Sequence, residues 1–263
     1  MKLKRPPLPP GATLVKTPPY LLTQRAIREL GRERGALTVS GSPGTGKTFT
    51  VDDYFAAHDS DVIKIHIPGT DRGYAFLRRV VRRLGGVDSG DVDDLLAELT
   101  ETVGDRRLLI YVDEAHRLNI DSLRQICFIR DQVDLDVSFI LVGSDFRRAY
   151  RIVPELWSRV THRTSFDPLE GDALVAALAA FHPFLRDADP SLLRRIDEQH
   201  CRGNWRVWTL TLEKLQSRAR AFKSGLTEQV AAAALGTSVD VQRAPARPTG
   251  TPARQGQRRK KAA

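Results

Sequence analysis

A glycine-rich segment of the chain has the residue types needed to hold a phosphate group. The segment reads G-S-P-G-T-G-K-T and matches the pattern GxxxxGK[ST] in full; its residues are Gly41, Ser42, Pro43, Gly44, Thr45, Gly46, Lys47 and Thr48. Glycines let the backbone wrap closely around an anion, with several N–H groups pointing inward. In this pattern the lysine contacts the β- and γ-phosphates and the threonine hydroxyl binds Mg²⁺. The segment therefore predicts an ATP·Mg²⁺ site, with a chance glycine-rich turn as the alternative.

Two adjacent acidic residues provide the second half of such a site. Asp113 and Glu114 directly follow the apolar run Leu108–Val112, which is typical of a buried strand. At the end of a core strand, Asp113 would order Mg²⁺ and Glu114 would polarise the attacking water as general base. The alternative is a solvated helix start, where acids are common. His116 completes a D-E-A-H string, and we interpret it as a structural or relay residue.

The elements that must position these residues alternate between strands and helices. Apolar runs predict strands at 36–40, 61–67, 108–112 and 137–142. Helical spacing of apolar residues predicts helices at 20–34, from about 47, and at 71–84, 91–103 and 120–131. Strands that alternate with helices indicate an α/β fold with a parallel sheet covered by helices on both faces.

The last third of the chain has a different pattern. Helical patterns at 171–183, 190–200, 204–222 and 225–235 predict a small all-α lid. We therefore divide the chain into an extended N-terminal segment (1–19), an α/β domain (20–169), an α-helical lid (170–237) and a disordered basic tail (238–263).

The charge of the chain is concentrated at its ends. Its formal net charge is +9, from 41 Lys and Arg against 32 Asp and Glu. Residues 1–5 and 241–263 hold ten basic residues and no acids, and removing those ten leaves 31 basic against 32 acidic residues. The two cysteines, Cys127 and Cys201, have no zinc-site or disulfide spacing, which fits a reducing, cytoplasmic compartment. No apolar run is long enough to predict a membrane span.

With these motifs together, the chain resembles the AAA+ P-loop ATPases over roughly residues 20–220. Within that family it looks most like the transposition regulators TnsC, TniB and MuB, with ExeA-type and Orc/Cdc6-type ATPases as relatives. The strings that carry the resemblance are G-S-P-G-T-G-K-T, Y-V-D-E-A-H-R-L, F-I-L-V-G-S, E-L-W-S-R-V and G-N-W-R. The resemblance implies ATP hydrolysis with Mg²⁺ and a homo-oligomer, as a ring or a helical filament.

The resemblance also implies roles for residues outside the two main motifs. Ser144 occupies the sensor-1 position, with Asp145 as a rival. Arg159, in E-L-W-S-R-V, stands where such ATPases place the arginine finger, which acts on a neighbouring subunit's site. Arg163 competes for that role. Arg206, in G-N-W-R, resembles the sensor-2 arginine of the lid, and a surface ion pair with Glu213 is its alternative.

A basic helix face is the candidate DNA contact. In the predicted helix 71–84 the basic residues gather opposite the apolar side; they are Arg78, Arg79, Arg82 and Arg83. Four guanidinium groups in one patch could follow a phosphate backbone, although charged helix faces are also ordinary solvated surfaces. The cluster R-R-K-K at 258–261 could add to DNA binding or contact a partner.

These observations lead to one expected function and two alternatives. The expectation is an ATP-dependent regulator of transposition that assembles on double-stranded DNA, recruits a transposase and possibly a target-selector protein, and disassembles on hydrolysis. The first alternative is a helicase loader or initiator-like ATPase. The second is a nucleotide-switched adaptor that binds proteins and no DNA.

Overall fold

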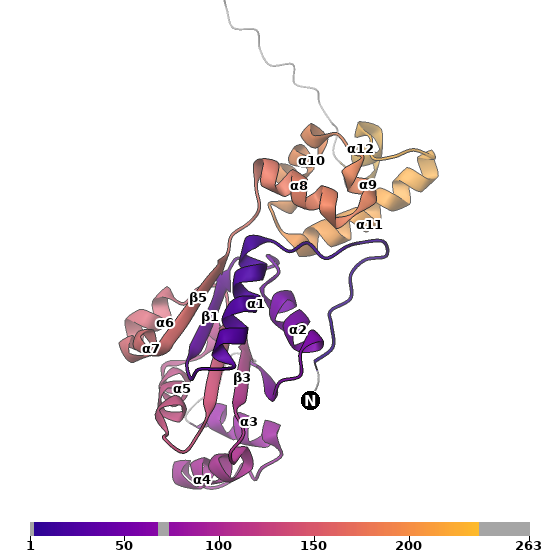
Figure 1. Cartoon of the computed structure of the whole chain (residues 1–263). Helices are drawn as coiled ribbons and strands as arrows, with labels where there is room; N and C mark the ends of the chain where they lie inside the picture. Colours follow the sequence, from indigo (N-terminus) through magenta and orange to yellow (C-terminus); the bar gives the residue numbers. More distant parts are fainter. Residues whose placement is uncertain (1–2, 68–73, 237–263) are drawn as a thin grey trace, which may run out of the picture.

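A five-stranded parallel sheet forms the centre of the larger part of the molecule (Figure 1). The computed structural model describes residues 3–67 and 74–236. The strands are β1 (Ala36–Gly41), β2 (Val62–His66), β3 (Leu108–Asp113), β4 (Val137–Val142) and β5 (Val160–Phe166). They lie in the order β2-β3-β4-β1-β5, and each adjacent pair is parallel. The carboxyl ends of all five strands therefore meet at one edge, where β1 ends at Gly41 and β3 at Asp113.

Helices cover both faces of this sheet, which explains why its central strands are continuous apolar runs. All residues of β3 and β4 are buried. Along β3, Leu109 and Tyr111 pack with one helix layer, whereas Ile110 and Val112 pack with the other. The expected α/β fold with a parallel sheet covered by helices is thus confirmed.

The two helix layers differ in size. One layer contains α1 (Pro18–Leu30) and α2 (Lys47–Ala57). The opposite layer contains α3 (Ala75–Leu84), α4 (Val92–Val103), α5 (Ile120–Asp131) and the short helices α6 (Arg147–Ile152) and α7 (Pro154–Arg159). Helix α1 ends at Leu30, short of the expected 34, and Gly31 is its C-cap residue. The expected start of α3 at 71 lies outside the described residues.

Strand β5 is the element that the sequence pattern does not predict. It lies at the edge of the sheet and pairs only with β1. Its exposed positions hold polar residues (Thr161, Arg163 and Ser165), so it has no apolar run. An edge strand can be polar because one side of it faces solvent.

The C-terminal part is entirely helical among the described residues. Its helices are α8 (Gly171–Phe181), α9 (Pro183–Arg186), α10 (Pro190–Ile196), α11 (Trp205–Phe222) and α12 (Glu228–Leu235). They have their own apolar core, which includes the fully buried Trp208. The indole N–H of Trp208 donates to Asp197 Oδ1 at 2.7 Å, so this buried carboxylate has a partner. We call these helices the lid; within the described residues, no helix has the length and apolar character to span a membrane.

Residues 3–17, which we call the N-terminal strap, connect the two parts of the molecule. The strap is extended and runs from the side of α2 to the lid before the chain turns into α1 (Figure 1). Near its start, Arg5 pairs with Asp53 of α2 at 2.6 Å. Further on, Leu8 and Val15 pack against the lid core, and Thr13 N–H donates to the Phe181 carbonyl at 2.7 Å. The expected basic tail (238–263) lies outside the described residues.

Candidate nucleotide site

The glycine-rich segment forms the turn between β1 and α2. Gly41, Gly44 and Gly46 all have positive φ angles, of 139°, 79° and 100°. Gly46 is the residue before α2, and its left-handed conformation favours glycine. No side chain caps this end of α2 and its first turn has no acid, so its free N–H groups and positive dipole end are available to an anion.

Lys47 lies inside this turn. Its side-chain ammonium donates to the carbonyls of Gly41 at 2.8 Å and Ser42 at 2.7 Å. Burial lowers the pKa of Lys47, while the nearby carboxylates of Glu114 and Asp113 act in the opposite direction. The ammonium is therefore next to the acids that the sequence assigns to the same site.

Thr48 and Asp113 come together as the metal prediction requires. The Thr48 hydroxyl donates to Asp113 Oδ1 at 3.2 Å. A hydroxyl oxygen beside a carboxylate is the kind of ligand that Mg²⁺ prefers, so this pair fits the metal. Lys64 of β2 lies 3.7 Å from Asp113 Oδ2 and bonds both carboxylate oxygens of Asp52 at 2.8 Å. This lysine belongs to no motif and could not be predicted from the sequence.

Glu114 follows Asp113 with an unusual backbone. Its φ of 57° lies in the left-handed region, which is rare for a residue with a side chain and is often found at functional sites. The Glu114 carboxylate is 3.4 Å from Arg117 Nε and 3.8 Å from His116 Nε2. The other ring nitrogen of His116, Nδ1, accepts a hydrogen bond from Ser144 N–H at 3.3 Å. His116 thus connects the end of β4 to Glu114.

Ser144 and its rival Asp145 occupy different surroundings. The Ser144 carbonyl accepts from Gly41 N–H at 3.1 Å, which places Ser144 beside the start of the glycine-rich turn. Asp145 is exposed and its carboxylate is engaged by Arg147, at 2.9 Å from Arg147 Nε. Of the two, Ser144 is therefore the one tied to the turn and, through His116, to Glu114.

A cavity of about 510 Å³ brings these segments together. Its walls include residues 43–48, Glu114 and the start of α11, where Arg206 and Trp205 lie. Arg206 is exposed and makes no ion pair or hydrogen bond within the described parts of the chain, so the alternative pairing with Glu213 is not seen. Arg206 and Lys47 both line the cavity, and the positive charge of Arg206 contributes to lowering the pKa of Lys47.

The strap forms a wall of the same cavity that the sequence motifs do not predict. Residues 6–9, 13–15 and Thr17 line it, and they include the apolar side chains of Leu8, Leu14 and Val15. Leucine and valine side chains between prolines are the only sequence signal that this segment packs against something, since solvated linkers are usually polar.

Comparison with known proteins identifies structures with a similar fold. Residues 28–150, which run from α1 to α6, match the family described as "AAA domain". The structure superimposes on the ORC2 protein of Aeropyrum pernix, in its ADPNP–ADP complexes, with a TM-score of 0.61 and 19% identity. That match covers 88% of this chain and 69% of the other. The chain has the AAA+ P-loop NTPase fold.

Two further structures share the AAA+ fold of this chain. One is the Aeropyrum pernix ORC1 protein in complex with DNA, with a TM-score of 0.61 and 16% identity over 86% of this chain and 65% of that one. The other is the RuvB Holliday junction branch migration motor of Thermotoga maritima, with a TM-score of 0.53 and 19% identity over 82% of this chain and 66% of that one. Among curated proteins none matches the sequence.

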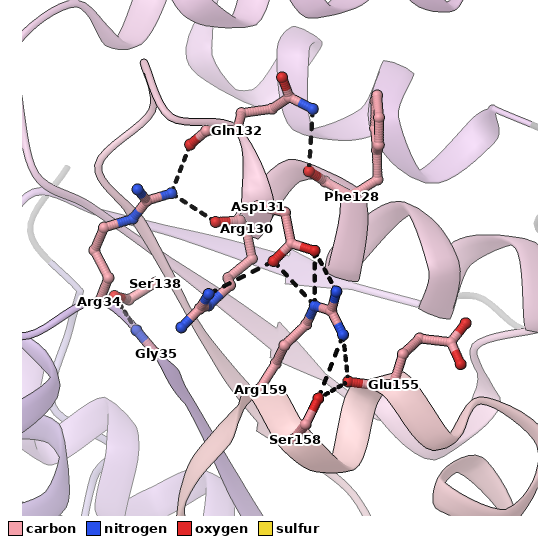
Figure 2. Close-up of polar contacts among 10 residues, drawn as sticks. All are labelled: Arg34, Gly35, Phe128, Arg130, Asp131, Gln132, Ser138, Glu155, Ser158 and Arg159. Carbon is pink, nitrogen blue, oxygen red and sulfur yellow. Dashed lines mark hydrogen bonds and ion pairs between the residues drawn. The ribbon is translucent and has the colours of Figure 1, made fainter.

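Arg159 lies far from the cavity that the glycine-rich turn lines. It precedes β5 at the edge of the sheet opposite Gly41, and six strand steps separate Val160 from Phe166, or about 20 Å. Its guanidinium contacts both carboxylate oxygens of Asp131 and the Glu155 carbonyl (Figure 2). Within this chain, Arg159 therefore belongs to the contact between α5 and α7 and takes no part in the cavity.

The rival Arg163 has a different environment. It lies in β5, and its guanidinium is 3.6 Å from the ring centroid of Trp157. It also donates to the Trp157 carbonyl at 2.9 Å. Trp157 is half exposed, so this stacked pair lies at the surface.

The four arginines of α3 do not form one free patch. Arg78 is partly buried and donates to the carbonyls of Asp88 at 2.8 Å and Gly90 at 2.6 Å. Arg82 pairs with Asp88 at 3.3 Å. Arg79 is partly buried as well, and Arg83 is exposed. Two of the four guanidinium groups thus hold the loop that follows the helix. The basic cluster at 258–261 lies outside the described residues.

Proposed function

We propose that this chain binds ATP with Mg²⁺ and hydrolyses it in the cavity between the sheet and the lid. The observation that carries the proposal is the convergence of Lys47, Thr48, Glu114 and Arg206 on one cavity, with Asp113 bonded to Thr48. These residues come from three separate segments of the chain. A chance glycine-rich turn would not place a buried lysine, two adjacent acids and a lid arginine around the same space.

Each residue has a distinct part in the proposed reaction. The N–H groups of the turn and the ammonium of Lys47 bind the phosphates, and Thr48 and Asp113 hold Mg²⁺, which neutralises phosphate charge. Glu114 accepts the proton of the attacking water as general base. His116 and Arg117 orient the Glu114 carboxylate, and Arg206 reaches the phosphates from the lid. The apolar side chains of the strap provide a surface for the base of the nucleotide.

We further propose that the ATPase acts on DNA as an initiator- or loader-like protein, in a homo-oligomer. The likeness to the DNA-bound ORC1 protein supports DNA binding, and the ORC2 likeness supports nucleotide binding. These comparisons favour the initiator-like alternative over the transposition regulator expected from the sequence motifs. No finding supports a transposase or target-selector partner.

The nucleotide part is tested with Lys47→Ala. Loss of the ammonium should abolish ATP binding in titration calorimetry, because no other group of the turn carries a positive charge to the phosphates. Retained micromolar affinity would contradict the assignment of the site.

The DNA part is tested by electron microscopy of the protein with a slowly hydrolysed ATP analogue, with and without duplex DNA. Small closed or open assemblies on DNA support the initiator-like function. Long filaments that form only on DNA favour the transposition regulator instead. Assemblies that ignore DNA in every nucleotide state favour the protein-directed adaptor.

A further inference from the structure

The lid is hydrogen-bonded directly to the phosphate-binding turn. The side-chain amide of Asn204 donates to the Pro43 carbonyl at 3.0 Å, and Trp205 N–H donates to the Gly44 carbonyl at 2.9 Å. Both donors belong to the residues that begin α11. The nucleotide cavity is therefore closed by a polar contact between two segments about 160 residues apart, as well as by apolar packing.

Asn204 uses both ends of its amide in this contact. While Nδ2 bonds the turn, Oδ1 accepts from Val207 N–H at 3.1 Å and caps α11. Because the cap needs an acceptor and the Pro43 carbonyl needs a donor, the two partners together fix the orientation of the amide. One side chain thus sets where α11 begins relative to the turn.

Gly44 allows this close approach. A Cβ atom on Gly44 would lie 2.0 Å from Asn204 Oδ1 and 2.5 Å from Nδ2, and the φ of Gly44 is +79°. Any side chain here would strain the backbone and displace the amide. The turn and the start of α11 are therefore in direct contact.

Arg206 stands two residues after Asn204, in the first turn of α11. Within the described residues it has no hydrogen bond or ion pair of its own to hold it. The position of the helix start determines where the backbone of Arg206 lies at the rim of the cavity, and that position is held by the bonds to Pro43 and Gly44.

We propose that Asn204 is a positioning residue, which holds α11 against the phosphate-binding turn so that Arg206 faces the phosphates. This inference rests on the proposed function of the cavity as an ATP site. Asn204 does not itself contact the nucleotide; it acts through Arg206. Its contribution to ATP binding should therefore disappear when Arg206 is absent.

A double-mutant cycle tests this coupling. The dissociation constant for ATP with Mg²⁺ is measured by calorimetry on the full chain for wild type, Asn204→Ser, Arg206→Ala and the double variant. Serine is neutral and caps helices well, but it is too short to reach the Pro43 carbonyl. We expect Asn204→Ser to weaken ATP binding about three- to tenfold, the effect of one hydrogen bond. In the Arg206→Ala background the same change should cost less than about twofold.

Thr227→Ala is the matched control. Thr227 caps α12 in the same lid, bonds Val230 N–H at 3.3 Å and does not line the cavity. The Thr227→Ala substitution removes a helix cap and leaves the phosphate-binding turn unchanged, so ATP affinity should stay at the wild-type value. If Thr227→Ala weakens ATP binding as much as Asn204→Ser, the effect is general loss of lid stability and the inference is wrong.

One other outcome also overturns the inference. Equal effects of Asn204→Ser with and without Arg206 would show that Asn204 does not act through Arg206. Should Asn204→Ser fail to fold, Asn204→Thr is likewise neutral, caps helices and is too short to reach the Pro43 carbonyl, and it must show the same dependence on Arg206. If the wild-type protein binds no ATP, the proposed function is wrong. If it binds ATP but the effects of the two substitutions are additive, only the inference about Asn204 is wrong.

Discussion

Glu114 combines a solvent-accessible carboxylate with a left-handed backbone. This conformation costs about 1–2 kcal/mol for a residue with a side chain, so the surrounding structure must hold it. We predict that Glu114→Gln keeps ATP binding and slows hydrolysis about 10²–10⁴-fold, because glutamine cannot accept the proton of the attacking water. Phosphate release and calorimetry separate the two effects. Unchanged turnover would exclude Glu114 as the base.

Tyr20 gives a prediction about stability. Its hydroxyl donates to Asp53 Oδ2 at 2.6 Å, and both residues are buried. Burial, with the hydrogen bond to Asp53 next, raises the pKa of Tyr20 well above its usual value, so the hydroxyl stays protonated. Tyr20→Phe leaves one oxygen of a buried carboxylate without its partner. We expect the free energy of unfolding to fall by about 1–2 kcal/mol in urea denaturation.

Tyr74→Phe is the control for this change. Tyr74 is about half exposed, so its hydroxyl can hydrogen-bond to water in both the folded and the unfolded state. Its free energy of unfolding should match that of wild type. Equal denaturation midpoints for Tyr20→Phe and Tyr74→Phe would mean that the bond to Asp53 adds no stability.

At the scale of elements, the strands that are buried on both faces could be predicted from the sequence. β3 and β4 are continuous apolar runs because helices cover both of their faces, and the structure has them at 108–113 and 137–142. β5 could not be predicted, since an edge strand with one solvated side needs no apolar run. Polar pattern alone does not distinguish it from a loop.

The residues of the candidate site likewise fall into those that the sequence predicts and those that it does not. The turn 41–48 and the pair of acids after β3 have local spacings that determine their chemistry, so the sequence predicts them. Asn204 and the strap act through contacts between segments far apart in the chain. Such contacts leave no spacing to recognise, and for that reason only the structure reveals them.

The ion pair between α5 and α7 gives a prediction at this scale. The carboxylate of Asp131, at the end of α5, accepts from Arg159 at 2.9 Å, and this hydrogen bond holds the pKa of Asp131 below its usual value (Figure 2). Asp131→Asn should lower the free energy of unfolding by about 0.5–1 kcal/mol, since the pair is partly exposed and screened.

The pH dependence of this difference follows from the direction of the shift. A carboxylate whose folded pKa is depressed contributes stability above its unfolded pKa and loses it as the pH falls through the folded value. Wild type and Asp131→Asn should therefore differ equally at pH 8 and pH 5, and the difference should shrink only below about pH 4. Urea denaturation across this range measures it. A difference that vanishes already at pH 6 would point to another group.

At the scale of the whole molecule, the position of Arg159 predicts complementation between subunits. Arg159→Ala and Lys47→Ala should each be inactive as single variants. For Arg159→Ala the hydrolysis rate should fall about 10³-fold or more, because the positive charge that stabilises the transition state is missing. In an equimolar mixture, a subunit with an intact turn meets a neighbour with an intact Arg159. Random mixing should then restore about one quarter of the wild-type phosphate release.

The same mixture distinguishes Arg159 from Arg163. If Arg163→Ala is the inactive variant that complements Lys47→Ala, Arg163 is the group that acts in trans. If neither arginine variant complements, the proposed reaction does not use a residue from the neighbouring subunit.

The path of the strap has a consequence for the synthesis of the protein. Thr13 N–H donates to the carbonyl of Phe181 in the lid, and Phe181 is added to the growing chain 168 residues after Thr13. At about 5–20 residues per second, the ribosome needs roughly 10–30 s to make that stretch. During this interval the sheet and its helices can form, while the strap has no lid to pack against. The cavity therefore closes only after the lid has been made, and the leucines and valine of the strap are exposed to chaperones until then.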